Sequence, residues 1–259
     1  MSTESEAGIM FNPRTLRQRH SRMRTRRCLL VAPICFITLM AAAVSAETSP
    51  SLSTTDRVGA TLSTLCPGAH PVKDTSRQAD LDGDGIADIS VLVECPAGSD
   101  RRLVVLKGSA NGTLHLLAQS ATWPTDPNRW DGLVVQNDVL IYQQGCNASC
   151  SEPTSLDYKF RYSKGSLVLI GQEQRHMWRD AEDGNEIQVD TGVSVNYLNR
   201  TVIYFGNRGA KHFKRALSFS PLPLVPLSGF DADKVDEQHR QIRALSGYVD
   251  ANLVLHFLD

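Results

Sequence analysis

Short apolar runs separated by turn residues make up most of the chain from about residue 60 onward. Each run has the length of a strand, is rich in β-branched or aromatic residues, and ends at residues typical of turns. Residues 156–162 (LDYKFRY) alternate apolar and charged side chains, as expected for a strand with one face in water. The clearest runs are residues 89–94, 102–107, 113–119, 132–136, 139–143, 156–162, 166–171, 192–198 and 201–205.

Tight-turn dipeptides separate several neighbouring runs. Asn, Asp and Gly tolerate the positive φ angles that two-residue hairpin loops require. The dipeptides are Asn111-Gly112, Asn137-Asp138, Lys164-Gly165 and Asn199-Arg200. They favour antiparallel hairpins that follow one another along the chain.

One segment near the C-terminus, residues 231–245, has a helical rather than a strand-like period. Asp231 or Asp233 can cap its first turn. The proline-rich residues 221–226 (PLPLVP) precede it as an extended connector. The sequence therefore predicts a mainly β fold, an antiparallel meander or sandwich-like sheet with a short C-terminal helix. Because no repeat of fixed period is present, a complete propeller is not implied.

The N-terminal region has the layout of an export signal. Seven Arg and no Lys precede an apolar run at residues 28–44, and the small residues Val44-Ser45-Ala46 follow as a cleavage site. The run is short for a membrane span and contains Pro33, which favours cleavage over a stable membrane anchor. We therefore predict a signal peptide at residues 1–46 and a periplasmic or secreted bacterial protein.

The rest of the chain divides into two parts. Residues 47–59 are polar and rich in Ser and Thr, which predicts a flexible leader. Residues 60–259 are predicted to form a single β-rich domain. Met1, Met10 and Met23 remain alternative start sites, and the Arg pair before the apolar run leaves Sec and twin-arginine export both open.

The charge balance changes once the signal is set aside. The chain has 27 basic and 28 acidic residues, of which the first 46 residues hold seven Arg and two Glu. The remainder therefore has 20 basic and 26 acidic residues. A mildly acidic domain lacks the cationic face that binding to nucleic acid requires.

Four cysteines remain outside the signal, an even number that agrees with an oxidising compartment. They allow three pairings. We favour Cys66–Cys95, which closes over an acidic segment, and Cys146–Cys150 as a local clasp. A zinc site is the alternative, but no His lies close to Cys146 or Cys150 in the sequence.

Residues 80–88 contain the one motif that carries a specific chemistry, D-x-D-x-D-G-x-x-D. Carboxylates at this spacing in a tight loop can converge on one cation, and the glycine at the sixth position permits a sharp turn. Hard oxygen ligands of this kind suit Ca²⁺. The alternative is a solvated acidic turn without an ion. The predicted ligands are Asp80, Asp82, Asp84, Asp88 and the backbone carbonyl of Ile86.

This loop departs from an EF-hand, because Val91 stands where that motif has a bidentate Glu and a strand-like run follows. It resembles the calcium loops of FG-GAP and integrin-α repeats, although it occurs once here. Over residues 78–205 the order of runs resembles a family of small secreted bacterial proteins with a single such loop and no assigned function. A Cys146–Cys150 segment replaces a glycine-rich stretch of that family. The resemblance implies export, calcium and β structure.

Three tryptophans give weaker evidence of a binding surface than the acidic loop does. Trp123, Trp130 and Trp178 are expected in loops, either as partly buried anchors or as stacking surfaces for a sugar ring or a peptide.

No catalytic arrangement is recognisable. His115, His176 and His212 have no Ser, Cys or acidic partner in a known pattern. We therefore predict an exported calcium-binding module with a binding or structural role, whose partner is a protein or glycan of the cell envelope. The alternative is an exported hydrolase, in which calcium is only structural and loops at residues 123–131 and 175–183 form the site.

Overall fold

The structure is a computed structural model, and it describes residues 53–96, 100–124, 128–146, 154–182 and 184–258. The predicted signal peptide lies outside these residues. Neither α-helix among the described residues is long and apolar enough to cross a membrane.

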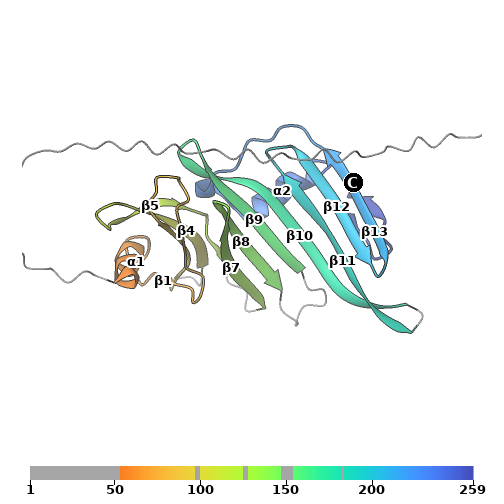
Figure 1. Cartoon of the computed structure of the whole chain (residues 1–259), viewed down its shortest axis with the longest axis horizontal. Coiled ribbons are helices and arrows are strands. Elements are labelled where there is room, and N and C mark those ends of the chain that lie inside the picture. The colour runs from red at the N-terminus through yellow and green to blue at the C-terminus, as the bar shows by residue number, and fades with distance from the viewer. Residues whose placement is uncertain (1–52, 97–99, 125–127, 147–153, 183, 259) are drawn as a thin grey trace, which may run out of the picture. The chain divides into compact units, whose positions relative to one another are not determined.

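Two antiparallel sheets contain most of the described strands (Figure 1). In the first sheet the order is β1-β3-β4-β5, with β2 paired to β3 and β6 paired to β4. Its strands are β1 (His70–Pro71), β2 (Arg77–Ala79), β3 (Asp88–Cys95), β4 (Asp100–Gly108), β5 (Leu114–Gln119) and β6 (Trp123–Pro124).

The second sheet is a meander in which each strand pairs with the next along the chain. Figure 1 shows these strands in sequence order, from β7 to β13. They are β7 (Arg129–Gln136), β8 (Val139–Cys146), β9 (Thr154–Ser163), β10 (Ser166–Glu182), β11 (Asn185–Asn196), β12 (Thr201–Arg208) and β13 (Lys211–Ser218). A small hairpin of β14 (Gly247–Val249) and β15 (Leu255–Phe257) follows near the C-terminus.

The predicted fold class is confirmed. Each of the nine predicted runs falls on a strand, although Thr113 precedes β5 and residues 197–198 follow β11. The hairpin turns have the backbone geometry that their residues favour. Asn137 and Asp138 have φ angles of 51° and 60°, and Lys164 and Gly165 have 51° and 87°. Two successive positive φ angles are typical of the type I′ turn, whose twist matches that of the strands.

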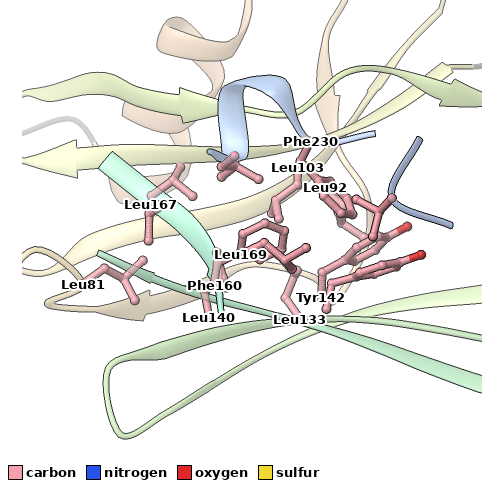
Figure 2. Close-up of a cluster of buried hydrophobic side chains, with 14 residues drawn as sticks. Leu81, Leu92, Leu103, Leu133, Leu140, Tyr142, Phe160, Leu167, Leu169 and Phe230 are labelled. Atoms are coloured by element: carbon pink, nitrogen blue, oxygen red, sulfur yellow. The ribbon is translucent and has the colours of Figure 1, made fainter. Parts of the chain in front are cut away.

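One buried apolar cluster draws on both sheets. It includes Leu92 and Leu103 from the first sheet, Tyr142 and Phe160 from the second, and Phe230 beyond the short helix η1 (Leu227–Gly229) (Figure 2). Each of these five side chains is fully buried. Burial of one such side chain stabilises the fold by about 1.5–3 kcal/mol, so this cluster joins the two sheets into one core.

Helix α1 (Thr54–Leu62) corrects the predicted flexible leader, which extended to residue 59. Ser53 caps the helix by accepting a hydrogen bond from the amide of Asp56 at 3.2 Å. Val58 and Leu62 are buried against the first sheet. Val58 and Leu62 are its only large apolar residues, so the segment has too weak a period to indicate a helix by itself.

The predicted C-terminal helix is present as α2 (Ala232–Arg240), and Asp231 caps it through the amides of Asp233 and Lys234. It ends five residues earlier than predicted. Residues 175–183 were predicted to be a loop, and this was wrong: residues 175–182 are the second half of β10 and pair with β11. Charged residues lie on both faces of this two-stranded ribbon, so its sequence does not alternate between apolar and polar residues as a half-buried strand does.

Candidate metal site

The acidic loop connects two paired strands, β2 and β3. Ala79, the last residue of β2, pairs with Asp88, the first residue of β3, so the ends of the loop are held together. Leu81 lies within the loop and is only 3% exposed, because its side chain enters the core cluster (Figure 2). Packing of Leu81 therefore anchors the aspartates on either side of it.

Three of the four predicted carboxylates come together. Asp80, Asp82 and Asp88 each offer an oxygen, and these oxygens all lie within 4.8 Å of one another. Calcium–oxygen bonds are about 2.3–2.6 Å long, so oxygens on opposite sides of one ion lie about 5 Å apart. The three carboxylates therefore fit a single hard cation.

Backbone amides orient Asp80. Its Oδ1 accepts hydrogen bonds from the amides of Gly83 (2.8 Å) and Asp84 (3.1 Å), and its Oδ2 accepts one from Gly85 (2.8 Å). Gly83 and Gly85 have φ angles of 80° and 85°, which residues with a Cβ rarely adopt. The glycines thus permit the turn that wraps the backbone around this carboxylate.

Asp88 is fully buried at the other end of the loop. Its two oxygens accept hydrogen bonds from the amides of Leu81 (3.0 Å) and Gly108 (3.1 Å). Burial raises the pKa of Asp88. A Cβ at Gly108 would lie 2.3 Å from the carbonyl oxygen of Ala87, so glycine is required where the loop meets β4.

Lys107 brings a positive charge to the loop. Its ammonium group forms ion pairs with Asp82 and with Asp84, the latter at 2.8 Å. The hydrogen bond to Asp82 is the main reason that the pKa of Lys107 is raised, and the bond from Lys107 lowers the pKa of Asp84. Asp84 lies outside the group of three and pairs with this lysine.

Lys107 was not predicted as part of the site, although the strand pattern indicates its position. Residues 89–94 and 102–107 were predicted as neighbouring antiparallel strands. In the observed register Ile89 pairs with Leu106, which places Lys107 beside Asp88 and the loop. Because two antiparallel neighbours pair outward from their connection, the start of the first run lies opposite the end of the second. This places Lys107 near Asp88.

Ile86 was predicted to contribute its carbonyl oxygen. Its amide donates a hydrogen bond to Asp84 Oδ1 at 2.9 Å, which helps to close the loop. The role of its carbonyl as a ligand stays a prediction.

The donor set defines the chemistry of this site. The group consists of carboxylates, which are hard ligands that suit Ca²⁺ or Mg²⁺ better than softer metals. Four aspartates face one lysine, so the loop keeps an excess of negative charge. The arrangement can accept a metal ion.

The predicted Cys66–Cys95 disulfide is confirmed, with a Cα–Cα distance of 6.1 Å. It joins the region after α1 to the end of β3, and the acidic loop lies between its two cysteines in sequence. Cys150 lies outside the described residues, so its pairing with Cys146 stays a prediction. A disulfide supports an oxidising compartment outside the cytoplasm.

The sequence predicted that the three tryptophans lie in loops, and this was wrong, because all three lie in strands. Trp123 is in β6, Trp130 in β7 and Trp178 in β10. Trp130 lies on Gly145, where an added Cβ would come within 2.1 Å of the indole ring. Local sequence suggested loops because Pro and Asp flank these residues.

Comparison with known proteins adds no assignment: no family model, no curated protein and no solved structure matches the chain.

Proposed function

We propose that the protein is an exported bacterial module whose acidic loop binds Ca²⁺ and whose role is binding or structural. The observation that carries this proposal is the convergence of Asp80, Asp82 and Asp88 within 4.8 Å. The likeness of the loop to FG-GAP repeats, and of the chain to small secreted proteins with one such loop, belongs to the proposal as well.

A weak affinity is sufficient for such a site. Calcium is abundant outside the cytoplasm, and extracellular modules bind it with Kd values of about 10⁻⁴–10⁻³ M. Lys107 forms ion pairs with Asp82 and Asp84, and these pairs have to break, at least in part, when a divalent ion binds. We therefore expect an affinity in this weak range.

Removal and return of calcium tests the proposal. Ligand binding to the folded state adds RT ln(1 + [L]/Kd), so 10 mM Ca²⁺ should stabilise the exported protein by about 1.4–2.7 kcal/mol at these affinities. The double variant Asp82→Ala with Asp84→Ala should lose this gain. Asp138→Asn, an exposed aspartate in a hairpin turn, is the matched control and should keep it.

The measurement is thermal and urea unfolding in calcium and in chelator. Equal stability under both conditions would refute the calcium proposal. The same gain with 10 mM Mg²⁺ would assign the site to divalent ions in general and would contradict the choice of calcium.

The hydrolase alternative rests on a cavity elsewhere, which Asp236, His239 and Ser246 help to line. These residues have other partners: His239 Nε2 lies 2.6 Å from the Tyr197 hydroxyl, and Asp236 accepts a hydrogen bond from Gln172. The Ser246 hydroxyl donates to backbone carbonyls. Hydrolysis would require these contacts to rearrange, so a binding role is the better interpretation.

A further inference from the structure

A cavity of about 720 Å³ lies between strands β10 and β11 and the C-terminal segment that contains α2 and β14. Sites for small ligands typically measure about 300–1,000 Å³. Figure 1 shows α2 beside β10, and a hydrogen bond between Gln172 and Asp236 joins the two elements. The cavity is separate from the acidic loop, none of whose residues line it.

Strand β10 supplies a polar wall to this cavity. Its inward side chains are first Leu167 and Leu169, which belong to the core cluster. A register shift between Leu169 and Gly171 then changes which residues face inward. Beyond it, Gln172, Gln174, His176 and Trp178 line the cavity. Polar side chains thus replace core residues on a covered sheet face, and buried polar groups of this kind need hydrogen-bond partners.

One end of the polar wall is held rigidly. Gln172 is 5% exposed, its oxygen accepts a hydrogen bond from the Tyr197 hydroxyl at 3.2 Å, and its amide nitrogen donates to Asp236 at 3.3 Å. The Tyr197 hydroxyl also lies 2.6 Å from His239 Nε2. This network fixes the orientation of the groups before any ligand enters.

Gln174, in the middle of the polar wall, has one hydrogen-bond acceptor that no described protein group uses. The Gln174 amide nitrogen lies 3.1 Å from His176 Nε2, and His176 Nδ1 lies 3.2 Å from the Thr154 hydroxyl. Within the ranges that the structure describes, the amide oxygen of Gln174 has no protein partner. It can therefore accept a hydrogen bond from a ligand hydroxyl.

Apolar side chains lie beside the polar ones in this cavity. Val193 and Val195 of β11 pair with Gln174 and Gln172 of β10 and lie on the same face of the sheet. Leu245 and Val249 line the cavity from the C-terminal segment. A ligand that fills this cavity therefore needs both hydrogen-bonding groups and C–H surface. Sugar rings have both, and Trp178 at one end of the cavity adds an aromatic face for stacking.

The charges that line the cavity exclude an anionic ligand. Asp236 and Asp250 line the cavity, and their carboxylates would repel an anion. Arg240, the one Lys or Arg among the described lining residues, is exposed and bonds to Glu237 at 2.7 Å. An anion would find no buried positive charge, whereas an uncharged polyol would avoid this cost.

The polar wall is long enough for more than one sugar unit. From Gln172 to Trp178 the strand extends by six residues, or about 20 Å at the usual rise per residue. We propose that this cavity binds an uncharged oligosaccharide. The inference names the partner class of the proposed binding role, and it rests on that role.

Calorimetric titration of the exported protein with cellotriose, maltotriose and chitotriose, in 10 mM Ca²⁺, tests this inference. At least one of these neutral trisaccharides should bind. Gln174→Leu removes a hydrogen-bonding group from the cavity and should weaken that binding about tenfold. Gln188→Leu is the matched control, because Gln188 is exposed on β11 and does not line the cavity, and it should leave the affinity unchanged.

Three results would overturn the inference: no binding of any of the three sugars, equal binding by Gln174→Leu, or equally tight binding of the anionic trigalacturonate. Thermal unfolding checks that Gln174→Leu is folded, and Gln174→Ala replaces it if it is not. Sugar binding without stabilisation by calcium would refute the metal proposal alone. Stabilisation by calcium without sugar binding would refute the oligosaccharide alone.

Discussion

Replacement of Leu81 by alanine tests whether the core holds the acidic loop in place. Leu81 lies between Asp80 and Asp82, two of the three converging carboxylates. Its side chain is 3% exposed and belongs to the cluster that joins both sheets. Truncation of this side chain therefore perturbs the core and the proposed metal site together.

The expected cost follows from the burial of Leu81. Leucine to alanine removes three carbon atoms, which at about 0.8 kcal/mol for each buried methylene amounts to roughly 2.4 kcal/mol. The remaining cavity adds to this, and fully buried Leu→Ala changes cost about 2.7–5.0 kcal/mol in total. We expect Leu81→Ala to lower the free energy of unfolding by about 3–4 kcal/mol.

Urea unfolding in chelator measures this free energy, and repetition in 10 mM Ca²⁺ shows whether the gain from calcium shrinks as the loop loosens. Leu198→Ala is the matched control, since Leu198 is 49% exposed, and it should cost less than about 0.5 kcal/mol. A loss below about 1 kcal/mol for Leu81→Ala would refute the reasoning. So would an unchanged gain from calcium.

Two further predictions concern the disulfide and the buried histidine. Cys66→Ser with Cys95→Ser opens a link between residues 29 positions apart and should lower the free energy of unfolding by about 3–4 kcal/mol; an unchanged urea midpoint would contradict this. Burial lowers the pKa of His239 to about 4, below its value of about 6.5 in the unfolded chain. The unfolded state then binds more protons between these values, so stability is full above about pH 6.5 and falls by up to about 3 kcal/mol as the pH drops to about 4. His239→Gln should show a smaller loss between pH 7 and pH 4.5 in urea unfolding, and equal losses would count against the explanation.

Strands and turns could be predicted from the sequence because their signals are local. Runs of β-branched residues and the dipeptide Asn137-Asp138 report on backbone preferences over a few positions. The acidic loop was predictable for the same reason, because Asp80 and Asp88 belong to one short motif. Helix α1 was missed, since it depends on packing of Val58 and Leu62 against a distant sheet.

The metal site and the cavity depend on contacts that the local sequence does not indicate. Lys107 reaches Asp82 only because β3 and β4 pair in one particular register, and it also pairs with Asp84, which lies outside the group of three. The cavity depends on a register shift in β10 and on a C-terminal segment that covers the sheet near Gln174. Neither feature can be read from any single stretch of residues.

The sequence by itself determined the mainly β class, the order of the hairpins and the position of a cation-binding motif, because each depends on neighbouring residues. Tertiary structure alone decided which carboxylates converge, which lysine competes for them, and which polar and apolar side chains line one cavity. These outcomes depend on strand register and on packing between segments far apart in the chain, where small free-energy differences summed over many contacts select one arrangement.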